Sequence, residues 1–246
     1  MQKDKTIHVD LFVPCHIDQF WPETGFNMKR LLELAGCVTH YNTEQTCCGQ
    51  PAFNAGFWDD AKEVGEKLIG EQLAGHYMVA ASSGCVSMVR QSYNQLFENS
   101  SVHNPSKNLQ KNFFDFAEFW VDILGNPHLN ATFNSRVALL DNCKGMRDCK
   151  IFDQPRKLLA QVEGLELVEI KDYDTCCGFG GIFSVKYELL SVALAEEKLK
   201  NVMDTGAEFL VCTDGGCLMH LDSYIKKNNL HIKAIHIVDL LVKGLK

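Results

Sequence analysis

The feature that most constrains this chain is the tetrapeptide Thr-Cys-Cys-Gly, which occurs at Thr46–Gly49 and again at Thr175–Gly178. Adjacent cysteines are uncommon, and an identical second copy indicates an internal repeat. The flanking sequences agree, because VAASSGC at Val79–Cys85 corresponds to VCTDGGC at Val211–Cys217. The chain is therefore predicted to be a tandem duplication of one cysteine-containing unit.

The other cysteines of the repeat keep nearly the same spacing in both halves. In each half, 31 or 32 residues separate the doublet from a preceding cysteine, and 36 or 39 residues separate it from a following one. With 246 residues, two domains of ordinary size fit the duplication, at 1–125 and 126–246. The eight matched cysteines, which we predict to be metal ligands, are Cys15, Cys47, Cys48, Cys85, Cys143, Cys176, Cys177 and Cys217.

Short apolar runs alternate with helical patterns in each half, which predicts parallel sheets with crossover helices. The expected fold class is α/β, with two similar Rossmann-like, doubly wound lobes. The motif cysteines follow predicted strands, and ligands of open α/β sheets bind beyond the carboxyl ends of the strands. We therefore expect the four cysteines of each half to converge on one rim, where helix starts would favour thiolates.

Three segments carry more specific expectations. Thr24 is predicted to cap a helix over Gly25–Leu34. The polar, proline-containing segment Glu98–Lys111 is predicted to be a linker. The aromatic run Phe113–Leu124 is predicted to be a helix that packs in a core or between domains.

The composition excludes several functions. A net charge of −7 argues against nucleic-acid binding and against attachment to a membrane surface through basic residues. The sequence starts without an apolar signal core, and no apolar run approaches the length of a membrane span, so a cytoplasmic protein is expected. In a reducing compartment, eleven cysteines indicate metal binding or thiol chemistry in preference to disulfides.

Four converging thiolates suit either tetrahedral zinc or an iron–sulfur cluster. Zinc sites usually take ligands from C-x-x-C turns, and the sequence contains none. Adjacent cysteines point in different directions, which favours a larger multi-iron cluster. Zinc in at least one half, and a metal-free thiol or structural role, are the alternatives.

The cysteine pattern resembles the tandem cysteine-rich CCG domain family, which includes the cysteine-rich subunit of heterodisulfide reductase. The segments TCCGQPAFNAG at Thr46–Gly56, TCCGFGGIFSVK at Thr175–Lys186 and CLMH at Cys217–His220 are similar to the LutA-type lactate-utilisation proteins. This resemblance implies an iron–sulfur subunit of a complex that oxidises L-lactate to pyruvate. Its partners would be a LutB-like ferredoxin-type protein and a LutC-like protein.

One departure limits what the resemblance implies. The family pattern often ends in C-x-x-C, which supplies a fifth thiolate to a noncubane cluster. Here Ser82 and Asp214 occupy those positions. The resemblance therefore does not specify the noncubane cluster, and an ordinary [4Fe–4S] cluster in each domain, or a cluster with an oxygen ligand from Ser82 or Asp214, is an equal expectation.

The remaining cysteines and two histidines are given ordinary roles. Cys37 and Cys212 are expected to pack as small apolar side chains, and Cys143 is preferred to Cys149 because it keeps the repeat spacing. His16 and His220 are expected to form hydrogen bonds without ligating a metal.

Gly178, Gly180 and Gly181 suggest a dinucleotide-binding loop, but Phe183 breaks the G-x-G-x-x-G pattern. A tight turn near a cluster explains these glycines better. No flavin or nicotinamide motif is recognisable, so the catalytic residues are unknown, and the protein is expected to move electrons beside partners. A thiol–disulfide oxidoreductase resembling heterodisulfide reductase and a zinc-binding, non-catalytic scaffold are the alternative functions.

Overall fold

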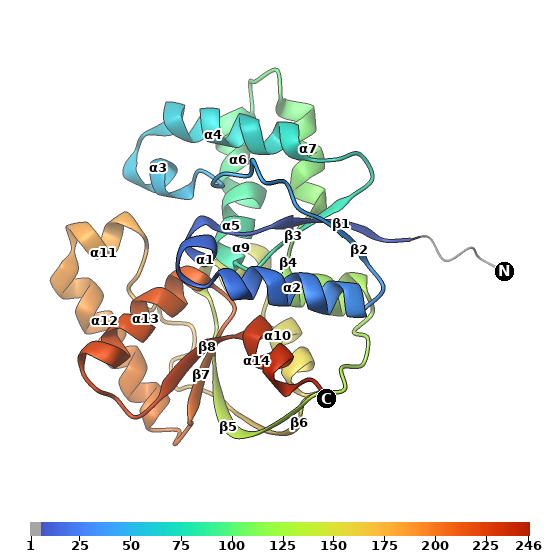
Figure 1. Cartoon of the computed structure of the whole chain (residues 1–246). Coiled ribbons are helices and arrows are strands. Elements are labelled where there is room, and N and C mark those ends of the chain that lie inside the picture. Colours follow the sequence, from blue (N-terminus) through green and yellow to red (C-terminus); the bar gives the residue numbers. More distant parts are fainter. Residues whose placement is uncertain (1–5) are drawn as a thin grey trace.

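The computed structural model describes residues 6–246 and contains two four-stranded sheets in which every pair of neighbouring strands is parallel. Helices flank both sheets, so the fold is α/β with two similar lobes, as predicted (Figure 1). The strands are β1 (His8–Phe12), β2 (Val38–His40), β3 (Tyr77–Ala80), β4 (Phe113–Asp115), β5 (Thr132–Leu140), β6 (Glu163–Val168), β7 (Phe209–Cys212) and β8 (Lys233–His236).

Both sheets have the same topology. The order is β2-β1-β3-β4 in the first and β6-β5-β7-β8 in the second. In a doubly wound sheet of this order, successive strands are added toward one edge and then toward the other, which creates a switch point between the two central strands, and ligands bind beyond the carboxyl ends of these strands. Each lobe therefore has its switch point where a motif cysteine follows a strand, namely after β1 and β3 and after β5 and β7.

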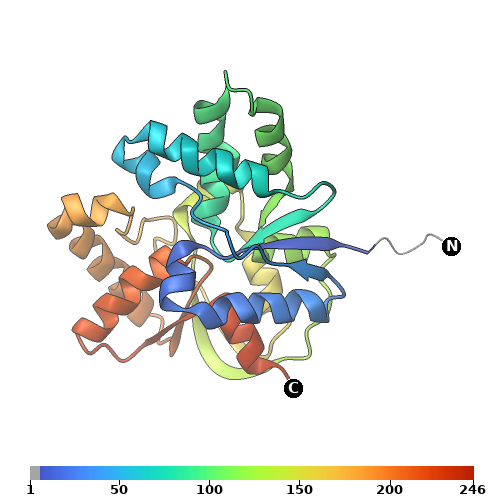
Figure 2. The same cartoon turned by 45° about the horizontal axis from the view of Figure 1, so that its top comes forward.

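The helices form three layers, which Figures 1 and 2 show from two directions. One outer layer covers the first sheet, a second covers the second sheet, and helices from both lobes meet between the sheets. The helices are α1 (Cys15–Phe20), α2 (Pro22–Leu34), α3 (Gln50–Ala55), α4 (Trp58–Glu71), α5 (Ser83–Ser87), η1 (Met88–Ser92), α6 (Tyr93–Phe97), α7 (His103–Asn112), α8 (Phe116–Glu118), η2 (Phe119–Ile123), α9 (Cys143–Cys149), α10 (Asp153–Leu159), α11 (Ile182–Lys186), α12 (Glu188–Met203), α13 (Gly215–Lys227) and α14 (Ile237–Gly244).

The lobes share one continuous core. Side chains alternate along a strand, so Val9 and Leu11 of β1 face the central layer while Phe12 faces the outer helices. The central cluster also contains Val137 and Leu139 of β5, together with α2 and α14, which pack against each other. Because this core draws on both halves, neither lobe buries its inner face without the other.

Three expectations about local structure were wrong or incomplete. Thr24 lies inside α2, where its hydroxyl donates to Asp239 Oδ2 of α14 at 2.7 Å, because the helix begins at Pro22. The expected linker contains α7, which buries Ser106 and Leu109. The aromatic run begins as β4 before it becomes helical, although its packing role is confirmed by the complete burial of Phe119 and the near-complete burial of Trp120.

The predicted domain boundary lies between η2 and β5, in the segment that joins the two lobes, and stays a prediction. Within residues 6–246, no helix combines the length and the apolar character needed to cross a lipid bilayer.

Candidate metal centre

In each lobe, the motif cysteines come from the same three places in the topology. Cys15 is the first residue of α1 and follows β1, and Cys85 lies in α5 just after β3. The doublet Cys47–Cys48 lies in the loop between β2 and α3. We call Cys15, Cys47, Cys48 and Cys85 the N-terminal cysteine group, and Cys143, Cys176, Cys177 and Cys217 the C-terminal cysteine group.

The structure brings the N-terminal cysteine group together. Cys15 Sγ lies 3.9 Å from Cys47 Sγ, so the cysteine 32 residues upstream reaches its own doublet. A hydrogen bond from the Cys15 thiol, followed by one from Cys48, lowers the pKa of Cys47 to about 2. The Cys48 pKa is raised, first by its hydrogen bonds to Cys47 and Cys85 and then by burial.

The C-terminal cysteine group repeats this arrangement. The Sγ atoms of Cys143 and Cys176 are 3.9 Å apart, and those of Cys177 and Cys217 are 3.1 Å apart. The Cys176 pKa is lowered to about 2, first by the hydrogen bond from Cys143. Hydrogen bonding to Cys176 and Cys217 and burial raise the pKa of Cys177. All eleven cysteines lie within the described residues, and all are free thiols.

The two cysteine groups face one cavity between the lobes. It has a volume of about 350 Å³ and is lined by all eight motif cysteines, with His16, Gln50, Asn142 and Asp214 among the polar residues. Sequence spacing predicted one group in each half, but it gave no reason to expect that both would open into the same space.

Ser82 and Asp214 join the two groups across this interface. Ser82 Oγ donates to Asp214 Oδ2 at 2.6 Å, and the backbones of the two residues form an antiparallel bridge. Asp214 Oδ2 also accepts from Gly84 N at 2.9 Å, while Oδ1 accepts from Gly216 N and Cys217 N.

Asp214 is thereby the N-cap of the helix that carries Cys217, and Ser82, whose Oγ accepts from Cys85 N at 3.4 Å, is the N-cap of the helix that carries Cys85. Burial raises the pKa of Asp214, but neighbouring His16 and the hydrogen bonds from Ser82 and Gly84 outweigh this effect and lower it. Both side chains thus have structural partners, which argues against the oxygen-ligand alternative and leaves four cysteines in each group as candidate ligands.

The glycine of each motif copy is required by backbone geometry. Gly49 and Gly178 have φ values of +84° and +93°, a region that residues with a side chain rarely adopt. A Cβ at residue 178 would lie 2.5 Å from the carbonyl oxygen of Ser191 in α12. Gly180 and Gly181 also have positive φ values, so these glycines form a tight turn beside the cysteines.

The cysteines outside the motif are placed elsewhere. Cys37 and Cys212 are buried in the apolar cores, as expected. Cys149 packs against the core of the first lobe and does not line the cavity, and burial raises its pKa to about 12. Cys143, which keeps the repeat spacing, is the member of this pair that reaches Cys176.

The two histidines next to motif cysteines differ. His220 Nε2 lies 3.3 Å from Ser191 Oγ, which is the ordinary hydrogen bonding predicted for it. His16 Nε2 is buried in the cavity wall and has no hydrogen-bond partner among the described residues. Burial lowers the His16 pKa, so the neutral imidazole is favoured.

Sequence reasoning missed Asn142. Its side-chain nitrogen donates to Cys217 Sγ at 3.3 Å, while its oxygen caps α9 by accepting from Gly145 N at 2.8 Å. An asparagine directly before a helix is a recognisable cap, but its contact with a cysteine 75 residues away depends on the fold.

The donor set fits a cationic, thiolate-bound centre. When no cation balances their charge, the four cysteines of each group compete for protons. One sulfur is then stabilised as a thiolate by hydrogen bonds from neighbouring cysteines, which keep their protons. Thiolate is the ligand form of cysteine for both zinc and iron–sulfur clusters, so four such side chains at one helix-lined rim are suited to hold either.

Comparisons with known proteins agree with this arrangement. The family model described as a cysteine-rich CCG domain matches residues 9–90 and 137–222. Lactate utilization protein A 2 of Bacillus cereus strain Q1 is 34% identical over 238 residues, which cover 96% of this chain and 98% of that protein. Lactate utilization protein A 1 of Bacillus mycoides is 36% identical over 235 residues, covering 95% and 96%.

A crystal structure of a hypothetical protein from Helicobacter pylori has the same fold, with a TM-score of 0.66 and 12% identity over 98% of this chain and 49% of that one. With two matched cysteine-rich domains and curated relatives aligned over nearly their full lengths, the chain belongs to the lactate utilization protein A family of tandem CCG proteins.

Proposed function

We propose that this protein acts in lactate utilisation as the iron–sulfur subunit of a complex that oxidises L-lactate to pyruvate. The observation that carries this proposal is the pair of four-cysteine groups opening into one cavity, in a chain of the lactate utilization protein A family. Each cysteine group would hold one [4Fe–4S] cluster, which when bound accepts and passes on single electrons.

The protein's own residues would bind and shield these clusters. Four thiolates in each group supply the ligands, and Cys48, Cys85, Cys177 and Cys217 are buried, which limits solvent access to that side. The Asn142 amide and the Gly178 N–H both point at sulfur, at 3.3 and 3.4 Å, and such bonds stabilise negative charge on a thiolate. Oxidising lactate to pyruvate releases two electrons and two protons, and the electrons would leave one at a time.

Partner proteins would dock beside the cavity. Large apolar side chains are exposed on α11 and α12, directly after the glycine turn that lines the cavity, and Leu189 is 90% exposed. Phe57 and Trp58, which follow α3, are also exposed, and α3 lies against α11 (Figure 1). An apolar surface at a redox cavity suits a LutB-like ferredoxin-type protein or a LutC-like protein, because electron transfer requires close approach. We place this assembly in the cytoplasm, where thiols stay reduced.

The deciding experiment is iron and sulfide analysis with electron paramagnetic resonance on anaerobically purified protein. The expected result is roughly eight iron and eight sulfide per chain, from two four-iron clusters. Adding LutB-like and LutC-like partners with L-lactate should then reduce the clusters and produce pyruvate. Stoichiometric zinc without sulfide would refute the cluster assignment.

Two alternative functions each have a specific observation in their favour. The first alternative is a zinc-binding scaffold. The Sγ atoms are 3.9 Å apart both in Cys15–Cys47 and in Cys143–Cys176, which matches the edge of a tetrahedron with zinc–sulfur bonds of about 2.3 Å. The second alternative is a thiol–disulfide oxidoreductase. It is favoured by the 3.1 Å between the Sγ atoms of Cys177 and Cys217, because two thiols this close together could form a disulfide. Turnover of a disulfide substrate by the isolated protein, without partners or lactate, would support that second alternative.

A further inference from the structure

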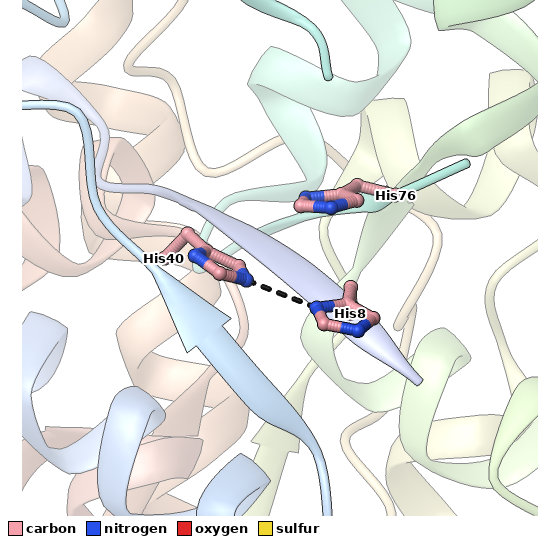
Figure 3. A group of neighbouring side chains, drawn as sticks. All are labelled: His8, His40 and His76. Atoms are coloured by element: carbon pink, nitrogen blue, oxygen red, sulfur yellow. Dashed lines mark hydrogen bonds between the residues drawn. The ribbon is translucent and has the colours of Figure 1, made fainter. Parts of the chain in front are cut away.

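Three histidines lie together on the first sheet, away from the cysteine groups. His8 is the first residue of β1, His40 is the last residue of β2, and His76 directly precedes β3 (Figure 3). The register pairs Asp10 with His40 and Val9 with Tyr77, so His76 continues opposite His8. Since alternate residues of a strand share a face, all three imidazoles project from the same face of the sheet.

The ring nitrogens converge. One nitrogen of each ring lies within 4.8 Å of one nitrogen of each of the others. His8 Nδ1 and His40 Nε2 are 3.1 Å apart, and Figure 3 marks this contact with a dashed line. Two nitrogens bound to one tetrahedral ion at about 2.0–2.1 Å would be about 3.3 Å apart, so this pair is already at ligand spacing. The His76 ring stacks on the other two, with its centroid 4.9 Å from that of His8 and 4.8 Å from that of His40, so it would have to turn to direct a nitrogen at the same ion.

A carboxylate orients the third ring. Asp10 Oδ1 lies 2.8 Å from His76 Nδ1, and Asp10 Oδ2 accepts from Leu73 N at 3.4 Å. A carboxylate on one imidazole nitrogen fixes the tautomer and directs the other nitrogen to a metal, as is usual for metal-bound histidines. The arrangement therefore has both the ligands and the supporting hydrogen bond of a metal site.

A cavity of about 250 Å³ adjoins one of the three histidines, His40. It is lined by Asp10 and His40, and also by Asn42, Gln45 and Glu71. Glu71 Oε1 is buried and has no hydrogen-bond partner among the described residues, and Lys67 Nζ lies 3.5 Å away. Glu71 lines this cavity together with Asp10 and His40, and its charge is paired with that of Lys67.

We propose that His8, His40 and His76 form a binding site for a divalent first-row transition metal of the zinc type, with Asp10 as the residue that positions His76. Neutral imidazoles suit Zn²⁺, Co²⁺, Ni²⁺ and Cu²⁺, whereas Mg²⁺ and Ca²⁺ prefer oxygen ligands. The ion would join three neighbouring strands, β2, β1 and β3, near the amino-terminal end of β1. This site is independent of the function proposed for the cysteine groups.

The test is a Co²⁺ titration of protein whose cysteine groups carry their native centres. Co²⁺ bound by imidazole gives visible d–d absorption, whereas Co²⁺ bound by thiolate adds strong near-ultraviolet charge-transfer bands, so the two kinds of site are distinguished. The protein should bind one equivalent without the thiolate bands. His40→Gln and His76→Gln should each abolish this binding, while His231→Gln, a change at an exposed histidine elsewhere, should leave it unchanged.

Two further measurements make the result decisive. Asp10→Asn should weaken Co²⁺ binding roughly 10–100-fold without removing it, as expected for loss of a supporting hydrogen bond. Zn²⁺ should raise the melting temperature of the unaltered protein and of His231→Gln but not of the site variants. If circular dichroism shows that His40→Gln or His76→Gln does not fold, the remaining one of these two variants is compared with His8→Gln and the unaltered protein. Equal Co²⁺ binding by the folded site variants and the unaltered protein would overturn the proposal.

Discussion

The two cysteine groups have the same topology but different surroundings. In the N-terminal group, Cys15 is exposed and also borders a second hollow of about 310 Å³, which Asp18 lines as well. In the C-terminal group, the equivalent Cys143 is only partly exposed, and Arg147 lowers the pKa of Cys176, after the larger effects of its neighbouring thiols. Duplication has kept the sulfur positions and changed the charge and solvent access around them.

The residue before the first cysteine shows how this difference arises. Pro14 precedes Cys15 and has no side-chain donor, whereas Asn142 precedes Cys143 and donates to Cys217 Sγ. One repeat thus gained a hydrogen bond to sulfur that the other cannot form. The comparison predicts that the two centres have the same ligands but differ in how readily they lose iron and in their reduction potentials.

The largest effect should come from removing one ligand of each group. Cys15→Ser and Cys143→Ser should each lower iron and sulfide by about half, because each group holds its own four-iron cluster. Cys149→Ser is the matched control and should keep the full content. Cys143→Ser keeps the N-terminal cluster, and Cys15→Ser keeps the C-terminal cluster. The N-terminal cluster should lose iron to a chelator faster, because its ligand Cys15 is exposed. Complete loss from either variant would contradict two independent centres.

The motif glycines offer a second comparison. Gly178→Ala should destabilise the protein by roughly 2–5 kcal/mol, because it combines a positive φ with a close contact to the Ser191 carbonyl. Gly49→Ala should cost less, roughly 1–3 kcal/mol, because its added Cβ would lie 3.1 Å from the Ala61 carbonyl oxygen. Urea unfolding of both variants measures the difference, and equal losses would show that backbone strain alone matters.

The two buried carboxylates between the lobes should respond differently to pH. Burial raises the pKa of Asp115 to about 7 despite its hydrogen bond from Ser83, whereas the Asp214 pKa is lowered. Between about pH 4 and 7, folded Asp115 keeps a proton that the unfolded chain releases, so its contribution to stability falls as pH rises and is lost above pH 7.

Asp115→Asn does not titrate and therefore removes this dependence. The free energy of unfolding of the variant, relative to the unaltered protein, should rise by roughly 1–3 kcal/mol between pH 4.5 and 8. Denaturant titrations at several pH values measure it. A difference that stays constant with pH would mean that Asp115 is ionised throughout that range.

The smallest effect should come from the hydrogen bond that distinguishes the groups. Asn142→Ser keeps an acceptor for Gly145 N and removes the donor to Cys217 Sγ. The reduction potential of the C-terminal cluster should become more negative by roughly tens of mV, because the bond stabilises the more negative reduced state. A redox titration in a Cys15→Ser background isolates this cluster, and an unchanged potential would exclude the bond as its cause.

The sequence predicted the fold class and the grouping of the cysteines because both depend on local pattern. The start of the aromatic run at Phe113 was predicted wrongly because its spacing suits a helix, and only pairing with β3 makes its first residues a strand. The contact between Ser82 and Asp214 depends on how the lobes meet, and neither residue carries a local signal for it. His8, His40 and His76 are brought together by strand register, which no motif in the chain encodes.

The core shared by β1, α2, β5 and α14 has a consequence for how this duplicated chain holds together. A single repeat expressed alone would leave an apolar face uncovered and would tend to self-associate. The intact chain should therefore melt in one cooperative transition. The two copies now form one folding unit, so a substitution that destabilises the core of one repeat lowers the melting temperature of the whole chain.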